Sequence, residues 1–156
     1  MDGMNNISIL IIIAFLSIFG CKTAKMEHEQ GIMGRTYWLE GNQMPMIVED
    51  DADPVGQEME AVQRIIRVYE LTNMNQASNK DGLFTDIETK LVAEAESDEE
   101  GSFQIGLPPG RYSVFTVEEE GLFASIFDQN LNINPVEVTA DEWVIMSIKI
   151  DYKAFY

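Results

Sequence analysis

Apolar and polar residues alternate along most of the chain beyond residue 30, which is the pattern of β-strands with one buried face. The clearest case is the segment 143–152. One face of that segment carries Val144, Met146, Ile148, Ile150 and Tyr152, and the other carries Ser147, Lys149 and Asp151. The same alternation predicts further strands over residues 31–40, 64–71, 87–96, 102–107, 111–118, 122–127 and 133–139.

Turn-forming residues separate these predicted strands. The segment 98–101 ends in glycine and is typical of a hairpin turn, and residues 79–82 and 120–121 are further predicted turns. The segment 108–110, Pro-Pro-Gly, predicts a tight corner, since neither proline can donate to a strand ladder. Only residues 58–63 leave room for a helical turn. The sequence therefore predicts an all-β fold, an antiparallel β-sandwich of about seven strands.

A different pattern occupies the N-terminus. Residues 7–19 are apolar except for Ser8 and Ser17. As a helix this run would be about 20 Å long, which is too short for the ~30 Å hydrocarbon core of a membrane. The length fits the apolar region of a signal peptide. The run ends at Gly20-Cys21, and a polar segment follows directly.

The residues Ile18-Phe19-Gly20-Cys21 resemble the lipobox of bacterial lipoproteins. This resemblance implies that residues 1–20 are a lipoprotein signal peptide, whether translation starts at Met1 or Met4. Cleavage would fall between Gly20 and Cys21, and Cys21 would carry diacylglycerol and palmitate-type acyl chains. Residues 21–30 would then form a tether, and residues 31–156 the folded domain. Because Lys22 replaces the aspartate that retains lipoproteins at the inner membrane, we expect the outer membrane of a Gram-negative bacterium, on its periplasmic or surface side.

Composition narrows the range of functions. The 27 acidic residues outnumber the 10 Lys and Arg residues, and the formal charge of −17 argues against nucleic acid as a partner. One cysteine and one histidine cannot form an internal disulfide or a Cys/His zinc site. The single histidine, His28, falls in the predicted tether and is a poor candidate for a catalytic base. We therefore expect that the protein is not an enzyme.

Residues 98–114 read DEEGSFQIGLPPGRYSV and resemble the carboxypeptidase regulatory-like family. The chain is also similar to small envelope lipoproteins of Bacteroidota, through segments such as 38–42 and 132–136. The resemblance implies a transthyretin-like or immunoglobulin-like sandwich, and it leaves the function open. The residues that match the family pattern are Gly101, Phe103, Ile105, Leu107, Pro108, Pro109, Gly110, Tyr112 and Ser113.

Acidic residues crowd one long loop, residues 41–63. Oxygen ligands at short spacing can hold Ca²⁺, which takes six to eight of them. The segment lacks the glycine and the distal glutamate of an EF-hand loop, so a solvated acidic surface is the main interpretation and we expect no cofactor. The candidate calcium ligands in this loop are Glu49, Asp50, Asp51 and Asp53.

These observations predict a lipid-anchored, non-catalytic β-sandwich that acts as an accessory or protein-interaction module of the cell envelope. Its expected partners are the membrane, through the lipidated cysteine, and an envelope protein or glycan. The alternative is a ligand-binding module for glycan, peptidoglycan or Ca²⁺. A glycan site would require at least two aromatic side chains next to each other on an exposed face, and the candidates are Tyr37, Trp38, Tyr69 and Trp143.

Overall fold

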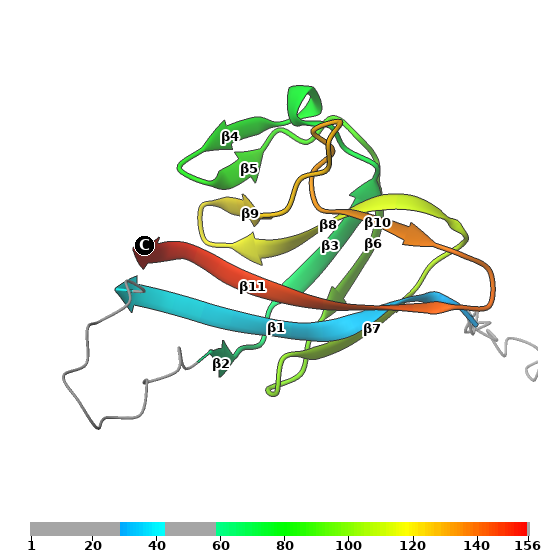
Figure 1. Cartoon of the computed structure of the whole chain (residues 1–156), viewed down its shortest axis with the longest axis horizontal. Coiled ribbons are helices and arrows are strands. Elements are labelled where there is room, and N and C mark those ends of the chain that lie inside the picture. Colours follow the sequence, from blue (N-terminus) through cyan, green and yellow to red (C-terminus); the bar gives the residue numbers. More distant parts are fainter. Residues whose placement is uncertain (1–28, 43–58, 156) are drawn as a thin grey trace, which may run out of the picture.

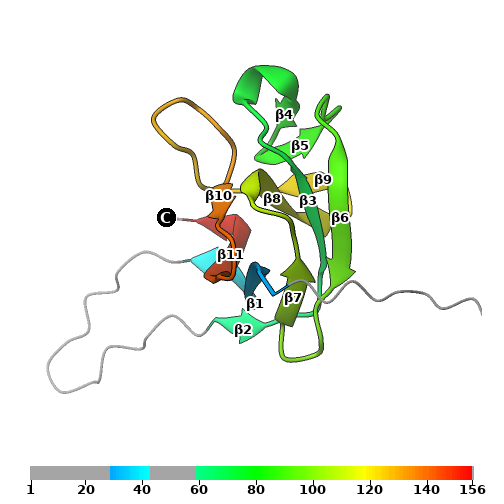
Figure 2. The ribbon, with the colours of Figure 1, turned by 90° about the vertical axis from the view of Figure 1, so that its right-hand side faces the viewer.

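The computed structural model describes residues 29–42 and 59–155, which form two β-sheets packed face to face (Figures 1 and 2). The described residues contain no α-helix, and their one 3-10 turn is η1, Met74–Gln76. The strands are β1 (Gly31–Asn42), β2 (Glu60–Ala61), β3 (Ile65–Glu70), β4 (Ser78–Lys80), β5 (Leu83–Thr85), β6 (Leu91–Glu96), β7 (Ser102–Gly106), β8 (Gly110–Glu118), β9 (Gly121–Phe123), β10 (Pro135–Val138) and β11 (Trp143–Phe155).

The four-stranded sheet is built around β1. On one side β1 pairs with β11 in parallel, from Gly31 beside Trp143 to Trp38 beside Ile150, and a β-bulge follows. On its other side β1 pairs antiparallel with β7 and then with β2. The long ribbons of β1 and β11 run side by side in Figure 1. Strand β11 is therefore an edge strand of this sheet.

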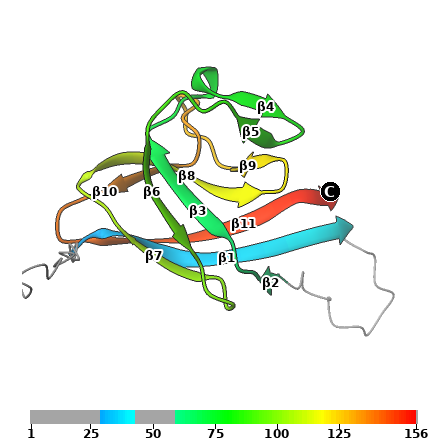
Figure 3. The same ribbon diagram turned by 180° about the vertical axis from the view of Figure 1, so that it is seen from behind.

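The seven-stranded sheet is antiparallel throughout. Its order is β4-β5-β9-β8-β3-β6, and β10 pairs with the first half of β8 (Figure 3). The main core lies between the two sheets, where alternate residues of facing strands are buried. The predicted inward residues Phe103, Ile105 and Leu107 are all in this core. The Tyr112 hydroxyl donates a hydrogen bond to the carbonyl of Pro108 (2.8 Å), which fixes the Pro-Pro-Gly corner.

A second core covers the opposite face of the seven-stranded sheet. Its buried members are Phe84, Phe115, Leu122, Ala124 and Ile133. They come from the β5, β8 and β9 strands and from the segment that leads to β10. The seven-stranded sheet thus buries apolar side chains on both of its faces, although β6 at its edge is largely exposed.

Hydrogen bonds to one carboxylate shape the covering segment 125–134. Asp128 accepts bonds from the backbone N–H groups of Asn130 and Asn132 (2.9 Å each) and from the Asn132 side chain (2.8 Å). The bond from the Asn132 side chain, followed by the backbone bonds, lowers the pKa of Asp128. This compact loop positions Ile133 over the second core.

The predicted all-β antiparallel sandwich is confirmed, with two differences in detail. The helical turn expected near residues 58–63 is wrong, because Glu60–Ala61 instead forms β2 and pairs with Tyr37 and Trp38. The described residues also form eleven strands, where about seven were predicted. The β4–β5 hairpin was missed because each of its strands has only three residues, too few to show alternation, although its turn at residues 79–82 was predicted.

Candidate functional site

Most of the residues predicted from the sequence to carry function lie outside the described residues. This holds for the lipidation and cleavage residues Cys21 and Gly20, and for His28. It also holds for the candidate calcium ligands Glu49, Asp50, Asp51 and Asp53. The lipid anchor and the calcium site therefore stay predictions.

The outer face of the four-stranded sheet exposes both apolar and polar side chains. The parallel register places Met33 beside Ile145 and Arg35 beside Ser147. On the other side of β1, Gln104 of β7 lies opposite Met33. The Ile145 side chain is 81% exposed, the highest value among the large apolar residues described. An apolar side chain in such a position on a regular strand commonly marks an interaction surface when it has apolar neighbours.

These side chains surround a shallow, open depression of about 800 Å³, which we call the outer-face hollow. Its charged lining residues are Arg35 and Asp98, one of each sign. The hollow is therefore close to neutral, although the chain as a whole carries −17. The side chains that define it are Met33, Arg35, Tyr37, Gln104, Ile145 and Ser147.

The four aromatic candidates for a glycan site are dispersed in the structure. Tyr37 lines the outer-face hollow, and Trp143 is half-buried at the start of β11. Trp38 packs against the main core, with its ring edge-on to Tyr152 at 5.5 Å between centroids. Tyr69 packs edge-on against Phe115 in the second core (5.6 Å). Only Tyr37 of the four belongs to the hollow.

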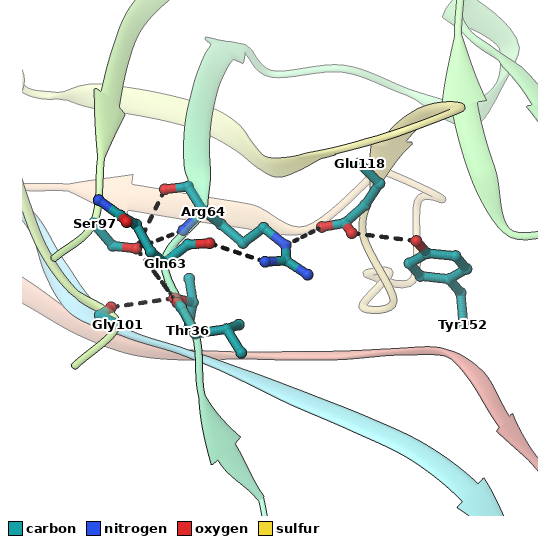
Figure 4. A network of polar contacts seen from close by, with 8 residues as sticks. Thr36, Gln63, Arg64, Ser97, Gly101, Glu118 and Tyr152 are labelled. Carbon is teal, nitrogen blue, oxygen red and sulfur yellow. Dashed lines mark hydrogen bonds and ion pairs between the residues drawn. The ribbon is translucent and has the colours of Figure 1, made fainter. Parts of the chain in front are cut away.

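A nearly buried ion pair closes one end of the main core (Figure 4). The Glu118 side chain is 3% exposed, and its Oε1 accepts a hydrogen bond from Arg64 Nε at 3.2 Å. Its Oε2 accepts a bond from the Tyr152 hydroxyl, also at 3.2 Å. The Arg64 guanidinium lies over the Trp38 ring, 5.4 Å from its centroid. Glu118 of β8 thus contacts both Tyr152 of β11 and Arg64, the residue that precedes β3.

The same network continues through uncharged side chains to the β6–β7 turn (Figure 4). Thr36 Oγ1 donates to the carbonyl of Gly101 (3.2 Å) and lies 3.4 Å from Ser97 Oγ. Ser97 Oγ accepts a bond from the backbone N–H of Arg64 (2.8 Å). Gly101 has φ +75°, and a Cβ there would collide with the Thr36 carbonyl, so this position requires glycine. The network holds the turn against β1.

The pKa of Tyr152 makes this network sensitive to high pH. Burial raises the pKa of the Tyr152 hydroxyl above its usual value of 10.0, and the charge on Glu118 adds to the effect. The unfolded chain therefore ionises first. The stabilisation from this tyrosine is complete below about pH 10 and is lost as pH rises towards the folded-state pKa.

We expect Tyr152→Phe to lower the free energy of unfolding at pH 7 by about 1 kcal/mol, because Glu118 loses one donor. Above pH 10 the variant should lose stability less steeply than the wild type, since the raised pKa is removed. Urea unfolding of both proteins between pH 7 and 11 measures the two effects. Parallel stability curves across this range would contradict the role given to Tyr152.

The described residues assemble no metal site, because no three of their His, Cys, Asp and Glu side chains lie close enough together to hold an ion. Within the same part of the chain, no helix has the length and apolar character to cross a membrane. The three consecutive glutamates 118–120 differ in environment: Glu119 and Glu120 are exposed, whereas the Glu118 side chain is 3% exposed. Sequence reasoning missed this burial of Glu118.

The fold and the outer-face hollow together define a class, a β-sandwich protein in which one sheet packs apolar side chains on both faces and the other has an outer face that no described residue covers. Comparison with known proteins found no matching family model, no matching curated protein and no matching solved structure. The resemblance to the carboxypeptidase regulatory-like family therefore stays a prediction.

Proposed function

We propose that the protein is a lipid-anchored, non-catalytic module of the cell envelope, and that it holds a partner through the outer face of its four-stranded sheet. The observation that carries the anchor is the position of Cys21. It is the only cysteine in the chain, and it directly follows the 7–19 apolar run. Two or three acyl chains on one cysteine give stable anchoring, where a single chain gives only reversible binding.

The uncovered sheet face supports the interaction half of the proposal. The seven-stranded sheet buries apolar side chains on both faces, whereas the outer face of the four-stranded sheet leaves Ile145 and the hollow exposed. A catalytic role has less support, because the buried Glu118 is engaged by Arg64 and Tyr152. A protein partner is favoured over a glycan because, of the two aromatic residues that line the hollow, Phe103 is buried in the main core and leaves Tyr37 as the one accessible ring. Glycan sites stack sugars on neighbouring aromatic faces.

The outer membrane is the proposed location because Lys22 follows Cys21 where inner-membrane lipoproteins carry an aspartate. The tether of residues 22–30 is short, so the domain stays close to the lipid surface. The strong negative charge keeps the domain in the aqueous phase, away from anionic headgroups. The partner is therefore expected among proteins of the envelope that approach the membrane surface.

Metabolic labelling with radioactive palmitate tests the anchor. We expect label on the wild-type protein and its recovery with the outer-membrane fraction. Cys21→Ala should remove the label, because no other thiol is present to accept a lipid. Ser17→Ala is the matched control and should keep the label, since it leaves both the apolar run and the cysteine in place. Label that persists on Cys21→Ala would refute the anchor.

A further inference from the structure

The free edge of β11 carries backbone groups that no described strand pairs. The N–H of Gly31 donates to the carbonyl of Glu142 (3.2 Å). This bond determines which residues of β11 turn their backbone N–H and C=O groups towards β1. In such a ladder every second residue of a strand turns its N–H and C=O to the neighbour. The even-numbered residues of β11 up to Ile150 therefore face β1. The N–H and C=O groups of Ile145 and Ser147 face away from it, and no other described residue forms a backbone hydrogen bond with them.

The first half of the β11 edge, before Lys149, also lacks the features that usually prevent strand pairing. Natural sheets protect their edges with charged side chains, prolines or very short strands. The first six residues of β11, 143–148, read WVIMSI and contain no charge and no proline. The other edge strands are shorter or protected: β2 has two residues, β7 has five and is soon followed by Pro108, β4 ends in Lys80, β6 carries Glu94 and Glu96, and β10 carries Pro135 and Glu137.

This edge borders the outer-face hollow. Ile145 and Ser147 provide both the unpaired backbone groups and part of the hollow's lining. A strand added beside β11 would place alternate side chains next to Ile145 and Ser147 on the outer face, on the side of β11 opposite Met33. The added strand would form hydrogen bonds with the unpaired backbone groups of Ile145 and Ser147. It would also cover the Ile145 side chain, the most exposed large apolar side chain among the described residues.

We propose that β11 binds an extended segment of a partner protein, which joins the four-stranded sheet as an additional strand. Only another extended backbone offers donors and acceptors at the two-residue spacing of this edge. The segment would be uncharged and rich in β-branched or aromatic residues where it lies along residues 143–148. This proposal rests on the proposed function in one respect, that the protein is an interaction module, and it does not depend on the lipid.

A second copy of the chain is the less favoured occupant. Each copy carries a formal charge of −17, so two copies repel each other as they approach. A partner segment without this charge meets no such barrier at the near-neutral hollow.

Ser147→Pro tests the backbone pairing directly. Proline removes the N–H of residue 147, which faces the free edge, and leaves the hydrogen bonds between β11 and β1 in place. The probe is a set of random peptides of about ten residues, selected by display on the detergent-solubilised full chain. Selected peptides should bind Ser147→Pro at least about tenfold more weakly than wild type. Ser147→Thr, which keeps the N–H, is the matched control and should bind as wild type does.

Two further measurements test strand addition at β11 if the Ser147→Pro variant does not fold. Ile145→Lys puts a charge on the edge at a side chain that is already exposed, so the variant should fold and bind the peptides about tenfold more weakly. N-methylation along a selected peptide should weaken binding at every second residue and leave the residues between unaffected, because only alternate N–H groups face β11.

The proposal is overturned if no peptide is selected, if the selected peptides bind Ser147→Pro and Ile145→Lys as tightly as wild type, or if N-methylation has no alternating effect. Self-association of the wild type that Ser147→Pro abolishes, seen by analytical ultracentrifugation, would assign the edge to a second copy and also overturn the partner segment. Palmitate labelling of Cys21 is independent of all these results, so failure of the edge and failure of the anchor are distinguishable.

Discussion

Arg64→Met is expected to lower the free energy of unfolding by about 3 kcal/mol. The substitution removes the cationic partner of Glu118, whose side chain is 3% exposed, and leaves a carboxylate charge in the main core. Among the described residues, the Tyr152 hydroxyl then remains as the hydrogen-bond donor to that carboxylate. Methionine keeps much of the packing of the arginine stem over Trp38, so the effect reports the lost charge more than lost volume. Urea unfolding at pH 7 measures the change.

The surface pair of Arg67 and Glu94 provides the matched control. Its Nε–Oε2 distance is 2.7 Å, shorter than in the buried pair, but both side chains are more than a third exposed. Arg67→Met should therefore cost less than about 1 kcal/mol. In the Arg64→Met background, Glu118→Gln should recover part of the lost stability, since it removes the unpaired charge. Equal losses for Arg64→Met and Arg67→Met would show that burial does not set the strength of the Glu118 pair.

The sequence predicted those parts of the fold in which local pattern and burial agree. In β11 the apolar residues Val144, Met146, Ile148 and Ile150 pack against or within the main core, as the alternation indicated. The Pro-Pro-Gly corner was also predictable, because proline limits the chain to few conformations wherever it occurs. Strand pairing could not be predicted from the local pattern. The parallel contact of β1 with β11 joins residues more than a hundred positions apart, and nothing local records it.

The candidate site was only partly predictable, for a related reason. Ile145 is an apolar residue at a polar-face position of β11, and this break in alternation was the one local signal of the outer-face hollow. The other parts of the hollow come from β1 and β7, so Arg35 and Gln104 could not be assigned to it without the register. Glu118 had a signal as well. It continues the inward series of Tyr112, Val114 and Thr116 in β8, but its place in an acidic run favoured a solvated turn.

Phe115→Ala is expected to have the largest effect, a loss of about 3–5 kcal/mol in the free energy of unfolding. Phe115 is fully buried at the centre of the second core, with Tyr69 and Phe84 edge-on to its ring at 5.6 and 5.8 Å. Removing it leaves a cavity under the β4–β5 hairpin, to which Phe84 belongs. Phe127→Ala is the matched control, because that ring is 43% exposed and lies farther from Phe84, at 6.3 Å. It should cost less than about 1.5 kcal/mol.

The same variant separates the two faces of the molecule. The second core lies on the face of the seven-stranded sheet turned away from the four-stranded sheet. The β4–β5 hairpin approaches β11 at Tyr152, beyond residues 143–148, so a loosened hairpin should leave residues 143–148 and the outer-face hollow unchanged. Below its unfolding transition, Phe115→Ala should therefore bind the edge-selected peptides as tightly as wild type. Thermal and urea unfolding measure the first effect, and peptide titration measures the second. Weakened peptide binding by a folded Phe115→Ala protein would contradict this separation. It would mean that packing in the second core affects the free edge of β11 through the main core.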